Sequence, residues 1–368
     1  MKTFIKSVLP FLAIGHSLAI AWTRVGCDAP WVVERIEDQE GPMTIDMDAV
    51  WANVDALSKG ARAAIASLDG FETLPSKARK NVVTSAEYVL PVDVSPHRGV
   101  HPDSQENMAD IVNVYEEVES ALAGALRVHG AQRGYIFCGG DSFTKARIPG
   151  IGESLAPATA WFLKRVESSL LPIENDQPVW SAAVIEAGEG GSHGTTDYII
   201  LDAFRGSQQG PCMETDGGYV GKTVYGRKAG SGPADNIIAV VLCPNKFKEN
   251  GLRAFATLDE GYATEKLGYK RPYIANYGSV SGTLLHEMVH VVGHARDPTP
   301  PPAGGYHDHA SGFREVYKLA RGQRTDPNTG RVGPATRDEK VFSPDGYRLF
   351  AEMCRSPDTT WGHPDQKK

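Results

Sequence analysis

The sequence predicts an α+β fold in which a mainly antiparallel sheet packs against one buried helix. Segments with a helical spacing of apolar residues come first, short strand-like segments between glycine-rich turns come next, and further helices follow. The buried helix is predicted over residues 278–293, where apolar residues surround a short polar motif. A chain of 368 residues with 41% hydrophobic content is long enough to bury a large core around that helix.

The first residues predict a secretory signal peptide over residues 1–21. Lys2 and Lys6 supply its positive charge, and residues 8–20 are mostly apolar. The triplet Ala19-Ile20-Ala21 offers the small residues of a cleavage site. This apolar segment is too short and too interrupted for a membrane anchor, and no later segment is long and apolar enough to cross a bilayer. We therefore expect a secreted, extracellular chain that does not bind a membrane once the signal is removed.

Five cysteines follow the signal peptide. In an oxidising compartment we expect two disulfides and one remaining thiol, although the spacing alone does not decide the pairing. The cysteines lie too far apart in the sequence for a zinc ribbon or a C-x-x-C redox motif. We therefore interpret all of them as structural: Cys27, Cys138, Cys212, Cys243 and Cys354.

Two regions are predicted after the signal peptide. Residues 22–130 form a mostly helical region, and residues 131–368 form the catalytic domain. The first region is either a pro-region that is removed or a part of the same domain. The dibasic pair Arg79-Lys80 is a processing site in the first case and an ordinary solvated pair in the second.

In the N-terminal region, helical spacing predicts a helix over residues 45–68 with an interruption at Gly60, and a second helix over residues 105–129. Residues 22–45 show no regular pattern, and the proline-containing residues 91–103 predict a loop.

Farther along the chain, β-branched and aromatic segments between glycine-rich turns predict hairpin strands. The strands are expected at residues 135–138, 179–185, 198–204, 219–225 and 237–242. Besides the buried helix, helices are expected at residues 156–171, 312–320 and 344–354, and a proline-rich loop at 298–302.

The polar motif in the buried helix is H-E-x-x-H, at residues 286–290. Side chains four positions apart lie on one face of a helix, so His286 and His290 can bind the same ion. Glu287 can reach a water held by that ion without being a ligand. Two hydrogen-bonded core histidines are the alternative, but a buried unpaired carboxylate is costly and argues against it. We expect a helix cap at Ser279 or Ser281 and a helix end at Gly293.

A catalytic zinc ion usually has three protein ligands and one open position, so the motif leaves the third ligand to be found. The metzincin spacing places it at Arg296, which cannot bind a cation. A glutamate on a later helix, Glu315 or Glu352, would give a gluzincin-like peptidase. The remaining candidates are Asp308 and three histidines: His294, His307 and His309.

Asp308 lies in a segment that resembles a known family. Residues 304–312 resemble the G-T-x-x-D-x-x-Y-G motif that follows H-E-x-x-H in aspzincins, the secreted zinc endopeptidases of the deuterolysin and fungal lysine-specific type. Both end glycines and the aspartate are in register, whereas Gly305 replaces the threonine and Ser311 the tyrosine. Residues 242–244 and 343–351 also resemble the family's L-C-P and N-A-D-x-Y-x-x-F-A segments, so the resemblance covers about residues 235–355.

The resemblance implies a zincin-like fold with one Zn²⁺ ion as cofactor. It implies His286, His290 and Asp308 as zinc ligands and Glu287 as the general base. Asp345 aligns with an acidic residue that receives the substrate lysine in the lysine-specific members. A helix N-cap is the other interpretation of Asp345.

The family's tyrosine is thought to stabilise the oxyanion, and Ser311 is too short to do so. Tyr306, Tyr317 and Tyr347 are candidates to replace it. We also expect a carboxylate to orient at least one ligand histidine, with Asp297 as the candidate.

The function that we expect is that of a secreted zinc endopeptidase, in which Glu287 takes a proton from a metal-activated water. The alternatives are a catalytically impaired binding protein or effector on the same scaffold, which the loss of the motif tyrosine favours, and a gluzincin-like peptidase. The expected partner is a peptide or protein substrate, and we expect a monomer. The net charge of −7 argues against a nucleic acid partner.

Overall fold

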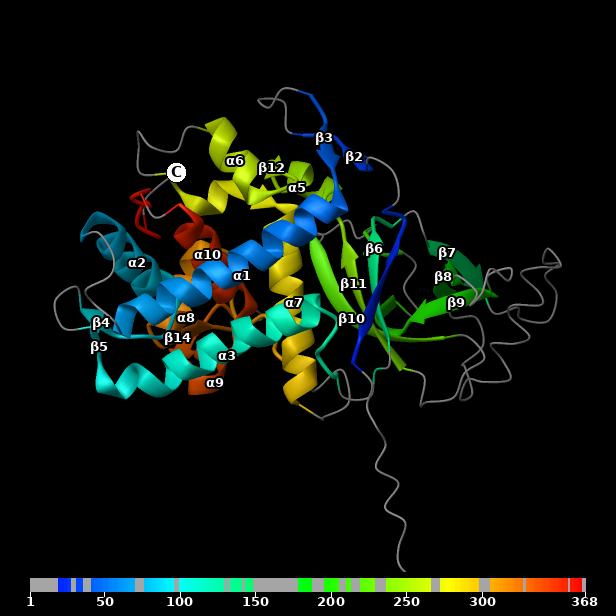
Figure 1. Cartoon of the computed structure of the whole chain (residues 1–368). Coiled ribbons are helices and arrows are strands. Elements are labelled where there is room, and N and C mark those ends of the chain that lie inside the picture. Colours follow the sequence, from blue (N-terminus) through cyan, green and yellow to red (C-terminus); the bar gives the residue numbers. More distant parts are fainter. Residues whose placement is uncertain are drawn as a thin grey trace, which may run out of the picture.

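A computed structural model describes most of the chain. The described residues are 19–27, 31–35, 41–69, 76–95, 99–128, 131, 133–140, 143–147, 178–186, 195–204, 210–212, 219–228, 236–265, 272–297, 305–326, 329–356 and 358–365. The fold is α+β, as predicted: a curled sheet lies beside a layer of helices (Figure 1). The predicted helix at 156–171, the proline-rich loop at 298–302 and most glycine-rich turns lie outside the described residues.

The helices of the described part are α1 Met47–Asp69, α2 Ser76–Val89, α3 Gln105–Leu122, α5 Asn245–Glu249, α6 Leu258–Glu265, α7 Val280–Arg296, α8 Phe313–Ala320, α9 Arg337–Val341 and α10 Pro344–Arg355. Helix α1 continues through Gly60, where we expected an interruption. Helix α3 ends earlier than predicted, because Gly124 adopts a φ of 68° that a helix cannot continue. No described helix is long and apolar enough to cross a membrane.

The main sheet contains β1 Ala21–Val25, β6 Arg133–Cys138, β7 Phe143–Arg147, β8 Pro178–Glu186, β9 Thr195–Leu201, β10 Gly221–Lys228 and β11 Asn236–Leu242. Its strand order is β1-β6-β11-β10-β9-β8-β7. The pairs β1–β6 and β6–β11 are parallel, and the other pairs are antiparallel, so the sheet is mainly antiparallel as predicted. The smaller pairs are β2 Trp31–Val33 with β3 Met43–Ile45, β4 Val94–Ser95 with β5 Gly99–Val100, β12 Arg253–Phe255 with β13 Tyr277–Ser279, and β14 Gln323–Thr325 with β15 Val332–Pro334.

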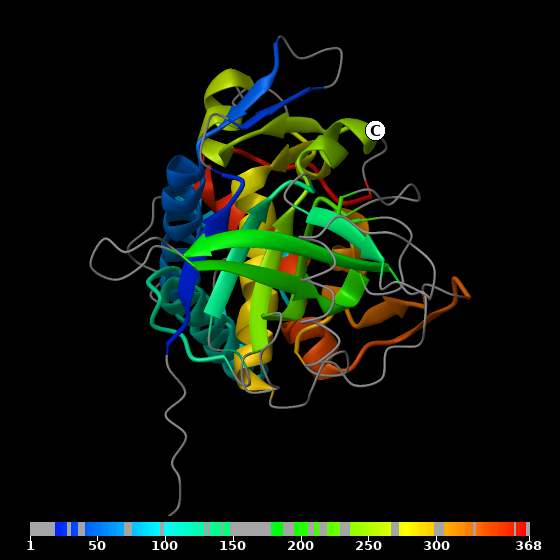
Figure 2. The same cartoon turned by 90° about the vertical axis from the view of Figure 1, so that its right-hand side faces the viewer.

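The two faces of the sheet bury two separate hydrophobic cores. Successive side chains of a strand point to opposite faces, so Ile238, Val240 and Leu242 of β11 join the helices in one core. Ile237, Ala239 and Val241 join the inner side of the curled sheet in the other. Helix α7 packs on the first face along β10 and β11, as Figure 2 shows from the sheet side.

The N-terminal residues form part of this structure. Strand β1 is an edge strand of the main sheet, and β2 pairs with β3, so the expectation of an irregular segment at 22–45 was wrong. No alternation of polar and apolar residues marks β1 in the sequence. The strand is held by its pairing with β6, far along the chain, which a local pattern does not reveal. Helices α1 and α3 pack directly on α7.

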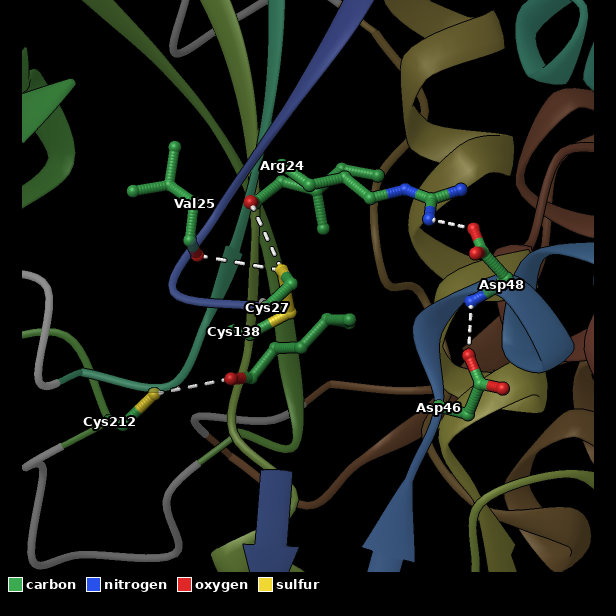
Figure 3. Close-up of a disulfide and its surroundings, with 9 residues drawn as sticks. Arg24, Val25, Cys27, Asp46, Asp48, Cys138 and Cys212 are labelled. Carbon is green, nitrogen blue, oxygen red and sulfur yellow. Dashed lines mark hydrogen bonds and ion pairs between the residues drawn. A yellow bond between two sulfur atoms is a disulfide. The ribbon is translucent and has the colours of Figure 1, made fainter. Parts of the chain in front are cut away.

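Two disulfides and one free thiol are present among the described cysteines, as predicted. Cys27–Cys138 joins the end of β1 to the end of β6 (Figure 3). Cys212–Cys243 joins a loop to the residue that follows β11, and Cys354 is free. Both disulfides therefore close the same end of the sheet.

Candidate metal centre

Helix α7 presents both histidines of the motif on one face. Its N-cap is Ser279, one of the two predicted caps. The Oγ atom of Ser279 accepts a hydrogen bond from the Gly282 N–H at 2.9 Å. The helix continues past Gly293, where we expected its end, to Arg296. Gly293 instead permits a close approach of Tyr306, because a Cβ there would lie 2.4 Å from the Tyr306 N atom. The Nε2 atoms of His286 and His290 lie 3.2 Å apart.

Asp308 completes the group from the loop that follows α7. Its Oδ1 lies 3.2 Å from Nε2 of His286 and 3.4 Å from Nε2 of His290. In the described part of the chain, this is the one group of three such side chains that can hold a metal ion. The side chain of Asp308 is 52% exposed, so the group opens to solvent on the side of this carboxylate.

The charges of the group favour a cation. Burial lowers the pKa of His286, but hydrogen bonds to Asp308 and Asp345 outweigh burial and raise this pKa well above its ordinary value. Burial raises the pKa of Asp308, yet its hydrogen bonds with the two imidazoles lower that pKa overall. Carboxylates that stabilise positive charge at this position would equally stabilise a bound metal ion.

The other proposed ligands do not join the group. Glu315 bonds Lys318 Nζ at 2.7 Å and Thr325 Oγ1 at 2.9 Å. Glu352 is buried beside the N-terminus of α7, where it accepts hydrogen bonds from Ser279 and Arg348. The three histidines proposed as further ligands do not belong to the group either: His294, His307 and His309.

Each ligand histidine is held through its second ring nitrogen. Nδ1 of His286 lies 3.0 Å from Oδ1 of Asp345, and Nδ1 of His290 lies 2.7 Å from the main-chain oxygen of Tyr306. These acceptors place the proton on Nδ1 and leave each Nε2 lone pair free for a metal ion. We expected Asp297 in this role; its Oδ2 accepts a hydrogen bond from the Gly305 N–H at 3.2 Å.

Asp345 is committed to this supporting role. Its side chain is buried, with Oδ1 also 3.0 Å from Arg348 Nε and Oδ2 2.9 Å from the Gly312 N–H. Burial raises the pKa of Asp345, but Arg348 and His286 lower it overall, so the carboxylate is ionised. These contacts give no support to the expectation that Asp345 receives a basic substrate side chain, because the carboxylate already has a basic partner in Arg348.

Among the described residues, none of the three candidate tyrosines has its hydroxyl bonded to the group of His286, His290 and Asp308. Tyr306 stacks on Phe342, and its hydroxyl accepts a hydrogen bond from Arg296 Nη1 at 3.0 Å. Tyr347 is 1% exposed and packs against Tyr115 in the core. The third candidate, Tyr317, packs beside Tyr88 and His363. The structure therefore gives no support to these tyrosines as oxyanion groups.

Glu287 lies between α7 and β10 and is 2% exposed. Its Oε2 accepts a hydrogen bond from Thr223 Oγ1 at 2.7 Å, and its Oε1 lies 4.0 Å from Nε2 of His286. Burial raises the pKa of Glu287, although both imidazoles and Thr223 oppose the shift. A carboxylate with a raised pKa, beside a metal-ligand group, is suited to accept and return a proton.

Thr223 and Gly221 both lie against Glu287, although no sequence motif marks either residue. The signal that would have found them is the alternation of the strand predicted at 219–225, which places positions 221, 223 and 225 on one face. Gly221 has no room for a side chain, because a Cβ there would lie 2.7 Å from Glu287 Oε1.

Comparison of the chain with protein-family models, with curated proteins and with solved structures found no match. The relation to the aspzincins therefore remains a resemblance of motifs, and the functional argument rests on the geometry of the site.

Proposed function

We propose that this protein is a secreted zinc-dependent endopeptidase with a zincin-like catalytic domain. The observation that carries the proposal is the group of His286, His290 and Asp308 with Glu287 Oε1 beside it. Two nitrogens and one carboxylate oxygen form a common donor set of catalytic zinc sites. The two disulfides support secretion, because such bonds persist in oxidising compartments.

The spacing of the three donor atoms suits a zinc ion. Two bonds of about 2.0–2.1 Å that meet at the tetrahedral angle end about 3.3–3.4 Å apart. The three donor atoms lie 3.2, 3.2 and 3.4 Å from one another. The exposed side of Asp308 provides the approach for a substrate and a water molecule.

A zinc ion bound there would act as a Lewis acid that activates water and polarises a peptide carbonyl. Glu287 supplies the proton transfer: its Oε1 accepts a proton from the attacking water and later returns it to the leaving amine. Asp345 and the Tyr306 carbonyl keep the two imidazoles in the orientation that binding requires.

A binding protein or effector that keeps the metal but has lost turnover is the second candidate. The placement of the tyrosines favours it, because Ser311 is exposed and none of the three candidate tyrosines contacts the ligand group through its hydroxyl. Stoichiometric zinc with no product from a broad peptide library would decide for this candidate. The gluzincin-like alternative loses its basis, since Glu315 and Glu352 are both bonded elsewhere.

Replacement of Glu287 tests the endopeptidase directly. Glu287→Ala should retain one zinc ion per chain and lose peptide cleavage, whereas Asp308→Ala should lose zinc affinity. Zinc content measured by mass spectrometry and cleavage of a peptide library give the two readouts. Glu315→Ala is the matched control and should retain both zinc and activity. Cleavage by Glu287→Ala at the wild-type rate would exclude the mechanism.

A further inference from the structure

A glutamate side chain needs support if only one of its oxygens is to face the reacting group. The carboxylate of Glu287 is buried, and Thr223 supplies the one side-chain hydrogen bond that the described residues provide to it. The two oxygens therefore differ: Oε2 is bonded to β10, and Oε1 is directed toward His286. A fixed carboxylate of this kind is a preorganised proton acceptor.

Strand β10 is shaped to receive this side chain. Gly221, Thr223 and Tyr225 lie opposite Leu242, Val240 and Ile238 of β11, on the face that packs against the helices. A Cβ at Gly221 would lie 2.5 Å from Thr283 Cγ2 and 2.7 Å from Glu287 Oε1, so the glycine leaves the space that the carboxylate occupies. At the next position on this face, Thr223 offers a hydroxyl.

We propose that Thr223 is a positioning residue that holds Glu287 with Oε2 on strand β10 and Oε1 toward the metal-ligand group. The inference rests on the proposed zinc peptidase function and assigns the support of its general base. Thr223 Oγ1 also lies 3.1 Å from the main-chain oxygen of Glu287, so the hydroxyl is located over the helical turn that carries the carboxylate.

The role belongs to the hydroxyl group and not to the volume of the side chain. Valine has nearly the same shape as threonine but leaves Oε2 of the buried carboxylate without its donor. A hydrogen bond to a charged group contributes enough that its removal changes an affinity or a rate by about 10- to 100-fold. Serine retains the hydroxyl donor, so Thr223→Ser should keep most of the wild-type affinity and rate.

Acetohydroxamate provides a test that does not depend on turnover. This probe chelates zinc through two oxygens and gives up a proton to a neighbouring carboxylate, so its affinity reports on the orientation of Glu287. Binding is measured by calorimetry on the zinc-loaded full chain for the wild type, Thr223→Val, Thr223→Ser and Glu287→Gln. Thr359→Val is the matched control, because Thr359 is also buried and bonds Ser356 far along the chain from the motif.

Thr223→Val should keep the zinc affinity of the wild type and bind acetohydroxamate about 10- to 100-fold more weakly. Its kcat on a cleaved peptide should fall by a similar factor with little change in KM. Thr223→Ser and Thr359→Val should stay within about threefold of the wild type. Where circular dichroism shows that Thr223→Val is unfolded, Thr223→Ala removes the same hydroxyl from a smaller side chain.

Wild-type affinity for acetohydroxamate in a folded hydroxyl-free variant would overturn the proposal, and so would a loss in Thr223→Ser as large as that in Thr223→Val. Failure of the proposed function has a different result: the wild type would bind zinc and acetohydroxamate but cleave no peptide. In that case the acetohydroxamate affinities still decide the role of Thr223.

Discussion

Asp345 connects His286, the first histidine of the H-E-x-x-H motif, to the interior of the protein. Its carboxylate bonds His286 on one side and Arg348 on the other, and a third bond comes from the Gly312 N–H in the loop that carries Asp308. The buried side chain of Asp345 thus holds both His286 on α7 and the main chain of Gly312, which follows Asp308 in the loop. Carboxylates in this position orient the imidazole and strengthen it as a ligand.

Asp345→Asn should therefore weaken zinc binding by about 10- to 100-fold without removing a ligand. The amide keeps an acceptor for His286 but loses the charge that pairs with Arg348. Competition with a chromophoric chelator measures the affinity. Asp259→Asn is the matched control, since the Asp259 carboxylate also pairs with an arginine, Arg355, and this variant should keep the zinc affinity of the wild type. Equal affinities in both variants would remove Asp345 from the site.

Gly221→Ala gives a second prediction, based on the space around the base. The added Cβ would lie 2.5 Å from Thr283 Cγ2, 2.7 Å from Glu287 Oε1 and 3.0 Å from its Cγ, so the carboxylate must move. We expect kcat to fall by at least about tenfold while zinc content stays at the wild-type value. Gly333→Ala is the control, because a Cβ at Gly333 meets nothing within 4 Å. Wild-type kcat in Gly221→Ala would show that the site accommodates the methyl group.

Helix α7 carries a third histidine, His294, one turn beyond His290. Its ring packs edge-on against Tyr225 of β10, and burial together with nearby His290 and His307 lowers the pKa of His294 to about 4. An unfolded histidine has a pKa of about 6.5. Between these two values the unfolded chain binds more protons than the folded chain, so the stability due to His294 is complete above pH 6.5 and is lost as the pH falls toward 4.

Replacement of His294 by leucine should remove this pH dependence. Between pH 7 and pH 4.5, the wild type should lose about 2 kcal/mol more unfolding free energy than His294→Leu. Urea unfolding of the metal-free proteins at both pH values measures the difference, and groups common to both proteins cancel. An equal loss of unfolding free energy in the two proteins would contradict the lowered pKa of His294 in the folded state.

Some elements were predictable from local sequence and others were not. The sequence pattern predicted α7, α8, α10, β8 and β11 closely, since runs or regular spacings of apolar residues mark these elements locally. Helical spacing predicted that His286 and His290 share one face, and the family resemblance pointed to Asp308 as their neighbour; these three side chains do lie together. The contacts of Thr223, Gly221 and Asp345 were not predictable, because each is made to α7 across the tertiary structure.

Ile20, the residue before strand β1, indicates where a signal peptide would end. Ile20 is 1% exposed, its N–H donates to the Leu126 carbonyl at 2.9 Å, and its side chain covers Gly134. Cleavage after Ala21 would remove this buried residue. Ser17 and Ala19 are also small residues two positions apart, and a cut after Ala19 keeps Ile20. We therefore expect Ile20 at the mature N-terminus, which N-terminal sequencing of the secreted protein can check; a start at Trp22 would contradict it.

In the whole molecule, the N-terminal helices and the metal site share one hydrophobic core. Arg296 of α7 bonds Glu117 of α3 at 2.6 Å, and Tyr115 of α3 donates to the Tyr347 carbonyl of α10 at 2.7 Å. The dibasic pair at 79–80 lies inside α2, where a helical backbone does not fit the extended conformation that proteases bind. These contacts favour a single domain over a removable pro-region.

Residues 131–368 produced alone should therefore not fold. Without α1 and α3, the apolar side of α7 that they cover would be exposed, and Arg296 and Tyr347 would lose their partners on α3. We expect this fragment to show no cooperative thermal transition and no stoichiometric zinc, and co-production with residues 20–130 to restore both. A pro-region behaves differently, because its removal leaves a folded domain that binds zinc. Circular dichroism and zinc content of the fragment thus separate the two organisations, and a folded, zinc-binding 131–368 fragment would show that the shared core is not essential to the metal site.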